Sequence, residues 1–232
     1  MSMADLELVL PNLASFRQWG KLAERCSLAK KLGCQLVEVP GDLVKNVTEM
    51  ARTGQAVGDI LGPEGVSSPY GQRAERCRFI LHTDPGIPRR AGQGRLFVPE
   101  LRWSDRHWTG SYAESIGDMA AAIGRRPRVL LENKARQKVA RVEEMTVVMD
   151  ALPRGQGYGL VIDVPNLWRS YRSGWKEAFR ELPREYVRGV HLHWKHRAPG
   201  ADDPIDWAVV LGTIRDRSGP LFVNPEVSQW TS

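Results

Sequence analysis

The chain has 232 residues, a formal net charge of +6 and 42% hydrophobic residues. This length suits one α/β barrel, since such barrels run to about 250 residues as a single domain. No uninterrupted apolar run approaches the roughly 20 residues that span a bilayer, which argues against a membrane protein.

In the first half of the chain, apolar runs alternate with segments of helical periodicity. The expected strands are residues 6–10, 36–39 and 79–82, and a helix is expected over 19–32. Ser111 and Glu114 form a capping box, which predicts a helix from there to Ile123. The long segment 83–110 is expected to be an irregular loop, of the size used for active-site lids.

The second half repeats a strand and a helix at shorter intervals. Further strands are expected at 129–132, 160–163, 187–193 and 221–223, and helices at 142–152, 175–182 and from Asp206 to Ile214. Such alternation implies βαβ units and a parallel sheet. An eighth strand would have to come from residues 96–98 or be absent. The chain is therefore expected to form a single domain over residues 1–232, a TIM-type (β/α) barrel with seven to eight strands.

Four apolar runs end on residues that can bind a metal. They are Leu130-Leu131-Glu132, Val161-Ile162-Asp163, Gly189-Val190-His191 and Phe222-Val223-Asn224-Pro225-Glu226. The strands of a parallel barrel point the same way, so their C-terminal ends converge on one mouth, where barrel enzymes build active sites. We expect Glu132, Asp163, His191 and Glu226 to form one divalent-metal site.

Several motifs in this order resemble the xylose-isomerase-like barrel superfamily, over most of the chain from Leu36 onward. The motifs are Leu131-Glu132-Asn133, Ile162-Asp163-Val164-Pro165-Asn166, Val190-His191-Leu192-His193, Arg197-Ala198-Pro199-Gly200 running into Ile205-Asp206-Trp207, and Pro225-Glu226. That group includes sugar isomerases, ketose 3-epimerases, inosose dehydratases and apurinic-site endonucleases.

The resemblance implies metal ligation by the same four residues and a metal-dependent isomerase, epimerase or dehydratase of a small sugar or polyol. The implied cofactor is one divalent ion, with Mn²⁺ favoured and Mg²⁺, Co²⁺ or Zn²⁺ as alternatives. Glu132 and Glu226 would move a proton next to a carbonyl. Residues expected to contact substrate are His82, Asn166, His193 and Arg197.

One departure from the superfamily's pattern concerns the metal site. Where these families commonly have an Asp followed three residues later by His, this chain has Asp163 and then Asn166. An amide can bind a substrate but is a poor metal ligand, and it cannot act as a base at neutral pH. This favours a single metal over the trinuclear zinc site of the endonucleases.

Two alternative functions stay open, an endonuclease-like phosphodiesterase acting on nucleic acid and a barrel without activity. The arginines are dispersed along the sequence, so a nucleic-acid partner is not favoured. Three cysteines without a metal-ligand pair, and no visible secretory signal, predict a cytoplasmic protein. A homo-oligomer is compatible with this interpretation, with Trp168 or Trp175 at the interface.

Overall fold

The computed structural model describes the parts of the chain that build most of the expected sheet. They are residues 6–8, 22–31, 37–40, 52–53, 56–57, 60, 77–81, 87–88, 95–96, 129–135, 139–152, 158–216 and 221–226. The helix expected at 111–123, His82 and most of the segment 83–110 lie outside the described residues.

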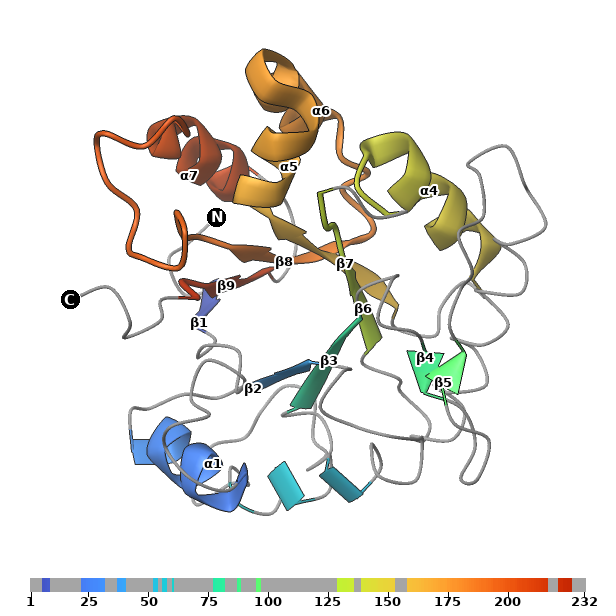
Figure 1. Ribbon diagram of the computed structural model, residues 1–232, viewed down its shortest axis with the longest axis vertical. Coiled ribbons are helices and arrows are strands. Elements are labelled where there is room, and N and C mark those ends of the chain that lie inside the picture. Colours follow the sequence, from blue (N-terminus) through green and yellow to red (C-terminus); the bar gives the residue numbers. More distant parts are fainter. Residues whose placement is uncertain are drawn as a thin grey trace.

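A seven-stranded sheet forms the centre of the molecule, and every neighbouring pair in it is parallel. Its order is β1-β9-β8-β7-β6-β3-β2. The strands are β1 (Leu6–Leu8), β2 (Val37–Pro40), β3 (Cys77–Leu81), β6 (Val129–Glu132), β7 (Gly159–Asp163), β8 (Val187–His191) and β9 (Leu221–Asn224). The first strand pairs with the last, as in a TIM-type barrel, so the sheet curls around an axis (Figure 1). Within the described residues it is not closed between β1 and β2.

Residues 96–98 were one candidate source of an eighth barrel strand, and that prediction is wrong for Leu96. Instead β5 (Arg95–Leu96) pairs antiparallel with β4 (Ile87–Pro88) in a separate two-stranded sheet. The physical reason is the short connection between them. Antiparallel strands can be joined by a short loop, whereas parallel neighbours need a crossover of a dozen or more residues.

Helices follow most strands of the second half and lie against the outside of the sheet (Figure 1). They are α4 (Val142–Ala151), α5 (Val164–Tyr171), the 3₁₀ turn η5 (Arg172–Gly174), α6 (Trp175–Glu181) and α7 (Trp207–Arg215), while α1 (Leu22–Lys31) follows β1. Helix α5 was not expected from the sequence. Its signal was present, because Asp163 caps the helix through the N–H of Asn166 and Pro165 occupies its first turn. Asp206 caps α7 as expected.

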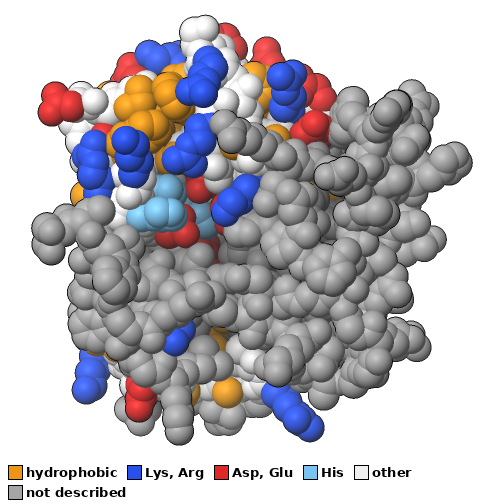
Figure 2. All heavy atoms as spheres, viewed as in Figure 1, with side chains coloured by type: hydrophobic (Ala, Val, Ile, Leu, Met, Phe, Trp, Pro, Cys, Tyr) orange, Lys and Arg blue, Asp and Glu red, His pale blue; other side chains and the backbone are white. Residues whose placement is uncertain are grey.

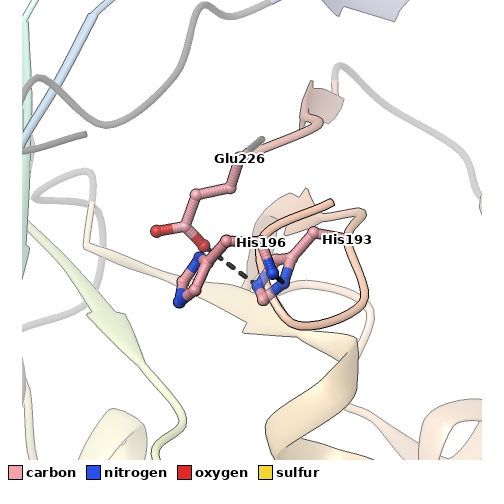
Figure 3. Close-up of side chains that lie close together, drawn as sticks. All are labelled: His193, His196 and Glu226. Carbon is pink, nitrogen blue, oxygen red and sulfur yellow. Dashed lines mark hydrogen bonds and ion pairs between the residues drawn. The ribbon is translucent and has the colours of Figure 1, made fainter. Parts of the chain in front are cut away.

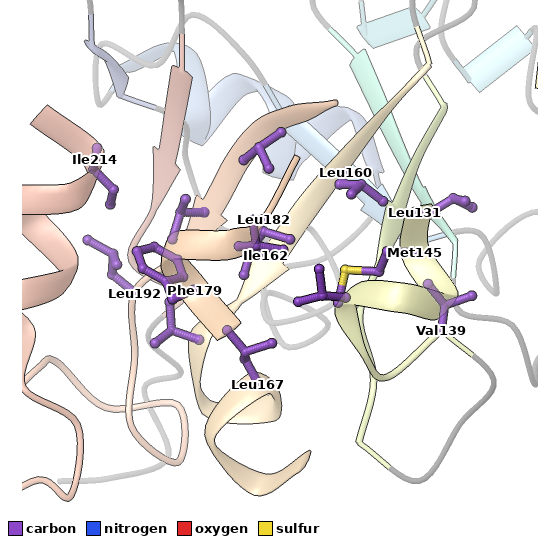
Figure 4. Packing of buried hydrophobic residues seen from close by; sticks show 14 of the residues in the cluster. Leu131, Val139, Met145, Leu160, Ile162, Leu167, Phe179, Leu182, Leu192 and Ile214 are labelled. Carbon is purple, nitrogen blue, oxygen red and sulfur yellow. The ribbon is translucent and has the colours of Figure 1, made fainter. Parts of the chain in front are cut away.

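The hydrophobic core fills the space between the sheet and these helices (Figure 4). Strand β7 is buried along its whole length, as expected for a parallel strand covered on both faces. Phe179 of α6 is fully buried in the core, and Trp175 lies beside it with ring centroids 6.5 Å apart. Trp175 is only 3% exposed, so the expectation that it could lie at a subunit interface is wrong. No helix in the described part of the chain has the length and apolar character to cross a membrane.

Candidate active site

Three of the expected metal ligands are the last residues of adjacent strands. Glu132 ends β6, Asp163 ends β7 and His191 ends β8, and Asp163 and His191 are register partners. Each is buried and offers one ligand atom, and these three atoms all lie within 4.8 Å of one another. The parallel sheet therefore brings these side chains to one point at its C-terminal edge.

Glu226, the fourth expected ligand, lies two residues beyond the end of β9 and joins the same cluster. Its Oε2 is 3.3 Å from Nδ1 of His191 and 3.1 Å from Nε2 of His193. The backbone of Glu226 has φ 36°, in the left-handed region that non-glycine residues rarely adopt. Strained backbone of this kind costs about 1 to 3 kcal/mol and is concentrated at functional sites. The strain is consistent with a selected position for this carboxylate.

Glu38 of β2 is a further buried carboxylate in the cluster, and it was not among the expected site residues. Its two carboxylate oxygens lie 2.9 and 3.0 Å from Nε2 of His191. If Nε2 carries the proton, it donates to Glu38 and leaves Nδ1 as the ring's lone-pair donor. Among the described residues Nδ1 has no partner of good hydrogen-bond geometry. A carboxylate that orients a ligating histidine in this way is typical of metal sites.

The buried carboxylates and histidines of the cluster shift one another's pKa values. Burial alone would lower the pKa of His191, but the charges of Glu38 and Glu226 outweigh it and raise that pKa well above its ordinary value. Burial raises the pKa of Glu38. Burial would also raise the pKa of Glu226, yet His191 and His193 hold it well below its usual range. The carboxylates thus favour a positive charge at this site, which suits the binding of a cation.

His193 lies inside the cluster and His196 at its exposed edge (Figure 3). Nε2 of His193 is 3.2 Å from Oδ2 of Asp163, and its Nδ1 accepts a hydrogen bond from the backbone N–H of His196. Burial would lower the pKa of His193, but its hydrogen bonds to Asp163 and Glu226 raise it to about 9. The two imidazole rings stack 4.6 Å apart. His193, His196 and Glu226 offer a second set of ligand atoms within 4.8 Å of one another.

A tight hairpin holds this histidine pair. The backbones of Trp194 and Arg197 exchange two hydrogen bonds, and the two residues between them, Lys195 and His196, have φ 51° and 59°. Two central residues with positive φ are the pattern of a type I′ turn, which usually uses Asn-Gly. The turn aims the His196 N–H at His193.

Two buried asparagines fix the backbone around the ligands. Asn133 accepts a hydrogen bond from the N–H of Asp163 and donates one to its carbonyl, at 2.7 and 3.0 Å. Asn224 accepts from the N–H of Glu226 and donates to Oε2 of Glu38. Both amides thus tie the end of one strand to a functional residue on another segment.

The other expected substrate contacts lie at the rim. Asn166 is buried, its N–H bonds Oδ1 of Asp163, and its Oδ1 accepts a hydrogen bond from Arg169 at 3.0 Å. Arg197 is half-buried and its guanidinium pairs with Asp203. His82, the remaining candidate, lies outside the described residues.

No family model matches the chain, and no curated protein matches its sequence. Solved structures do match it over nearly its whole length. The 3-keto-D-glucoside 4-epimerase YcjR from E. coli is 13% identical with a TM-score of 0.60, covering 98% of this chain and 94% of that one. The probable 3-DHS dehydratase AsbF from Bacillus anthracis is 11% identical with a TM-score of 0.55, covering 97% and 94%. The chain therefore shares the α/β-barrel fold of these proteins.

This barrel fold is shared by proteins of different activity. A family 2 AP endonuclease from Brucella melitensis is 12% identical with a TM-score of 0.59, covering 97% of this chain and 95% of that one. One barrel supports many reactions, so the likeness establishes the fold and the reaction has to be argued from the site.

Proposed function

We propose that the protein is a metal-dependent isomerase, epimerase or dehydratase that moves a proton next to the carbonyl of a small sugar or polyol. The observation that carries this proposal is the convergence of Glu132, Asp163, His191 and Glu226 at one end of the barrel. The named sugar epimerase and dehydratase of the same fold support it.

The donor atoms of the cluster fit a divalent ion. Three carboxylates and one imidazole form an oxygen-rich set, which suits Mn²⁺, Mg²⁺ or Co²⁺ and accommodates Zn²⁺. Nδ1 of His191 lies 3.3 Å from Oε2 of Glu226, so these two residues present a ring nitrogen and a carboxylate oxygen at the same point. A divalent ion held by these residues would polarise the substrate carbonyl and stabilise negative charge that develops on its oxygen.

Glu132 and Glu226 are the residues that we propose as proton carriers. They come from β6 and from the segment after β9, with β7 and β8 between them in the sheet. Two strands separate these carboxylates along the edge of the sheet, and in the proposed reaction one would remove a proton from the substrate carbon and the other would return it. Both residues are buried, so bulk water has little access to either carboxylate.

Asn166 and Arg197 would bind the substrate rather than react with it. The backbone N–H of Asn166 donates to Asp163 and its side-chain Oδ1 accepts from Arg169, so its side-chain NH₂ is the group that would donate to a substrate hydroxyl. Arg197 is tied to Asp203, which fixes its position at the rim. Neither group needs to change its protonation state.

The test is a pair of isosteric variants, Glu132→Gln and Glu226→Gln, assayed with Mn²⁺ on a panel of ketoses and inososes. Each variant keeps the side-chain volume and removes a base, so kcat should fall by at least about a hundredfold. Asn166→Ala is the matched control and should mainly raise KM, as expected for loss of a substrate contact. Near-normal kcat in both Gln variants would contradict the proton-carrier assignment, and a panel without Mn²⁺-dependent turnover would favour the inactive barrel.

An endonuclease-like phosphodiesterase is the second candidate, supported by the AP endonuclease of the same fold. Its discriminating assay is cleavage of a duplex that contains an abasic site. Cleavage that depends on Glu132 and Glu226, without turnover of any sugar, would put this candidate first.

A further inference from the structure

Beside the carboxylate cluster lies a second feature, an open pocket of about 910 Å³. We call it the basic pocket. Its walls are the segment after β6, the start of α4, helix α5 and the hairpin that carries Trp194. This volume is in the range that accommodates a small-molecule ligand.

The basic pocket carries a strong positive charge. In the described part of the chain, five cationic side chains line it: Lys134, Arg141, Arg169, Arg172 and Lys195. Among the described lining residues the one carboxylate is that of Glu144, which accepts hydrogen bonds from the backbone N–H groups of Ala140 and Arg141 as part of the α4 cap. Figure 2 shows Lys and Arg side chains around the histidines and carboxylates on this face. A concave wall with charge of one sign concentrates ligands of the opposite sign.

Two tryptophans position these cations. Trp168 and Trp194 meet edge to face with ring centroids 5.3 Å apart. Arg172 lies 4.7 Å from the Trp168 ring centroid, and Arg169 lies 5.9 Å from that of Trp194. Cations stacked on aromatic rings lose part of their side-chain freedom before a ligand arrives. Because the rings already contact these cations, the pocket is better suited to an anion than to stacked nucleobases.

Backbone strain also occurs at the basic pocket. Arg172 has φ 53° and Lys195 has φ 51°, and both are non-glycine residues. The other two described non-glycine residues with positive φ, His196 and Glu226, belong to the carboxylate cluster. All four residues therefore lie at the basic pocket or the neighbouring carboxylate cluster. This is expected if Arg172 and Lys195 present their charges to a ligand.

Asn166 connects the two features. It lines the basic pocket, its N–H bonds Asp163 at 2.7 Å, and its Oδ1 holds Arg169 at 3.0 Å. A ligand that extends from Asp163 past Asn166 thus passes directly from the carboxylates to the arginines.

We propose that the basic pocket binds the phosphate group of a phosphorylated sugar or polyol whose carbonyl end lies at the carboxylate cluster. This rests on the proposed function and narrows its substrate class. A phosphate monoester carries about 1.5 to 2 negative charges and three acceptor oxygens, which match the forked donors of two arginines. The four cations other than Lys134 are exposed side chains, so replacing them leaves the core intact.

The experiment measures binding of inorganic phosphate by calorimetry to the full chain in EDTA, at constant ionic strength. The test variant is the double substitution Arg169→Gln with Arg172→Gln. The control is Arg180→Gln, an exposed arginine of α6 that pairs with Glu177. Phosphate should bind the wild type and the control alike, and the double variant at least about tenfold more weakly, since it lacks the charge-assisted hydrogen bonds of two guanidinium groups.

Equal phosphate binding by all three proteins, or none by the wild type, would overturn the proposal. Two further ligands distinguish the source of the phosphate. Ribulose 5-phosphate should bind more tightly than ribulose, with the difference lost in the double variant. An abasic duplex that displaces phosphate at physiological ionic strength would overturn the sugar phosphate in favour of nucleic acid. Because EDTA removes metal ions, these phosphate-binding results do not depend on the metal site. The proposed function is tested separately, by comparing Mn²⁺ binding to the wild type and to Glu226→Gln.

Discussion

Replacing Glu38 by glutamine tests whether the carboxylate behind His191 controls metal binding. In the wild type both Glu38 oxygens face Nε2 of His191, and Oε2 also accepts from Asn224. A glutamine has one acceptor for these two donors. If its oxygen faces Asn224, its NH₂ donates to Nε2 of His191, and the ring proton moves to Nδ1, the nitrogen that faces Glu226. If the amide is reversed, its NH₂ opposes the NH₂ of Asn224.

Either orientation of the glutamine weakens metal binding. In the first orientation His191 carries its proton on Nδ1, and in the second a buried NH₂ group has no acceptor. Loss of such an outer carboxylate typically lowers metal affinity by about 10- to 100-fold. This corresponds to about 1.4 to 2.8 kcal/mol of binding free energy. The described hydrogen-bond partners of Glu38 are His191 and Asn224, neither of which is an expected substrate contact, so the effect should appear in metal binding before it appears in catalysis.

The assay is competition of a Mn²⁺-binding dye with wild type, Glu38→Gln and Glu177→Gln. The last is the control, since Glu177 is an exposed residue of α6 whose loss removes the same charge far from the core. Mn²⁺ at 100 times its Kd should also stabilise the wild type by about 2.7 kcal/mol, and the Glu38 variant correspondingly less at the same concentration. Equal Mn²⁺ affinity for Glu38→Gln and the control would refute this account of His191.

Three further predictions concern the residues that hold the site. Asn133→Ala removes the amide that bonds the buried N–H and carbonyl of Asp163, so it should lower the free energy of unfolding in urea by about 2 to 5 kcal/mol. Asn133→Asp should restore only the hydrogen bond from the N–H of Asp163, because a carboxylate has no N–H to donate to the carbonyl. Asp203→Asn should destabilise the protein at neutral pH. Burial would raise the pKa of Asp203, but hydrogen bonds from Gly200 and Trp207 and the charge of Arg197 lower it. The stability that the Asp203 carboxylate contributes is therefore complete above about pH 3.9, the pKa of an unfolded Asp, and is lost as the pH falls through the folded pKa. The difference in unfolding free energy between Asp203→Asn and the wild type should accordingly disappear in acid. Phe179→Ala should cost about 3 to 5 kcal/mol, and a loss under 1 kcal/mol would contradict its place in the core.

The strands β6, β7 and β8 and the polar residues at their ends could be predicted because apolar runs stop at Glu132, Asp163 and His191. Glu38 could not. Val37-Glu38-Val39 reads as a strand with one polar face toward water, whereas in the curled sheet all three residues are buried. In a barrel the inner face of a strand is enclosed, so an acid there is a site residue rather than a surface one.

The hairpin at Trp194 and Arg197 could not be predicted from the sequence for a different reason. A type I′ turn is recognised from Asn or Gly at its centre, and this one has Lys195 and His196. The pairing of Arg197 with Asp203 was also invisible, because it depends on how the intervening loop folds back. Patterns along the sequence report burial and periodicity, but these contacts depend on backbone conformations that the residue types disfavour.

Asp163 contributes one oxygen to the cap of α5 and the other to the cluster around His193. Helix α5 in turn carries Arg169, and Arg172 follows at its C-terminal end. Anything that binds Asp163 therefore also changes the free energy of fraying the first turn of α5, and by reciprocity an anion that orders α5 changes affinity at Asp163. Amide hydrogen exchange at Asn166 and Leu167 would record this coupling as slower opening of the helix N-terminus when either ligand is bound.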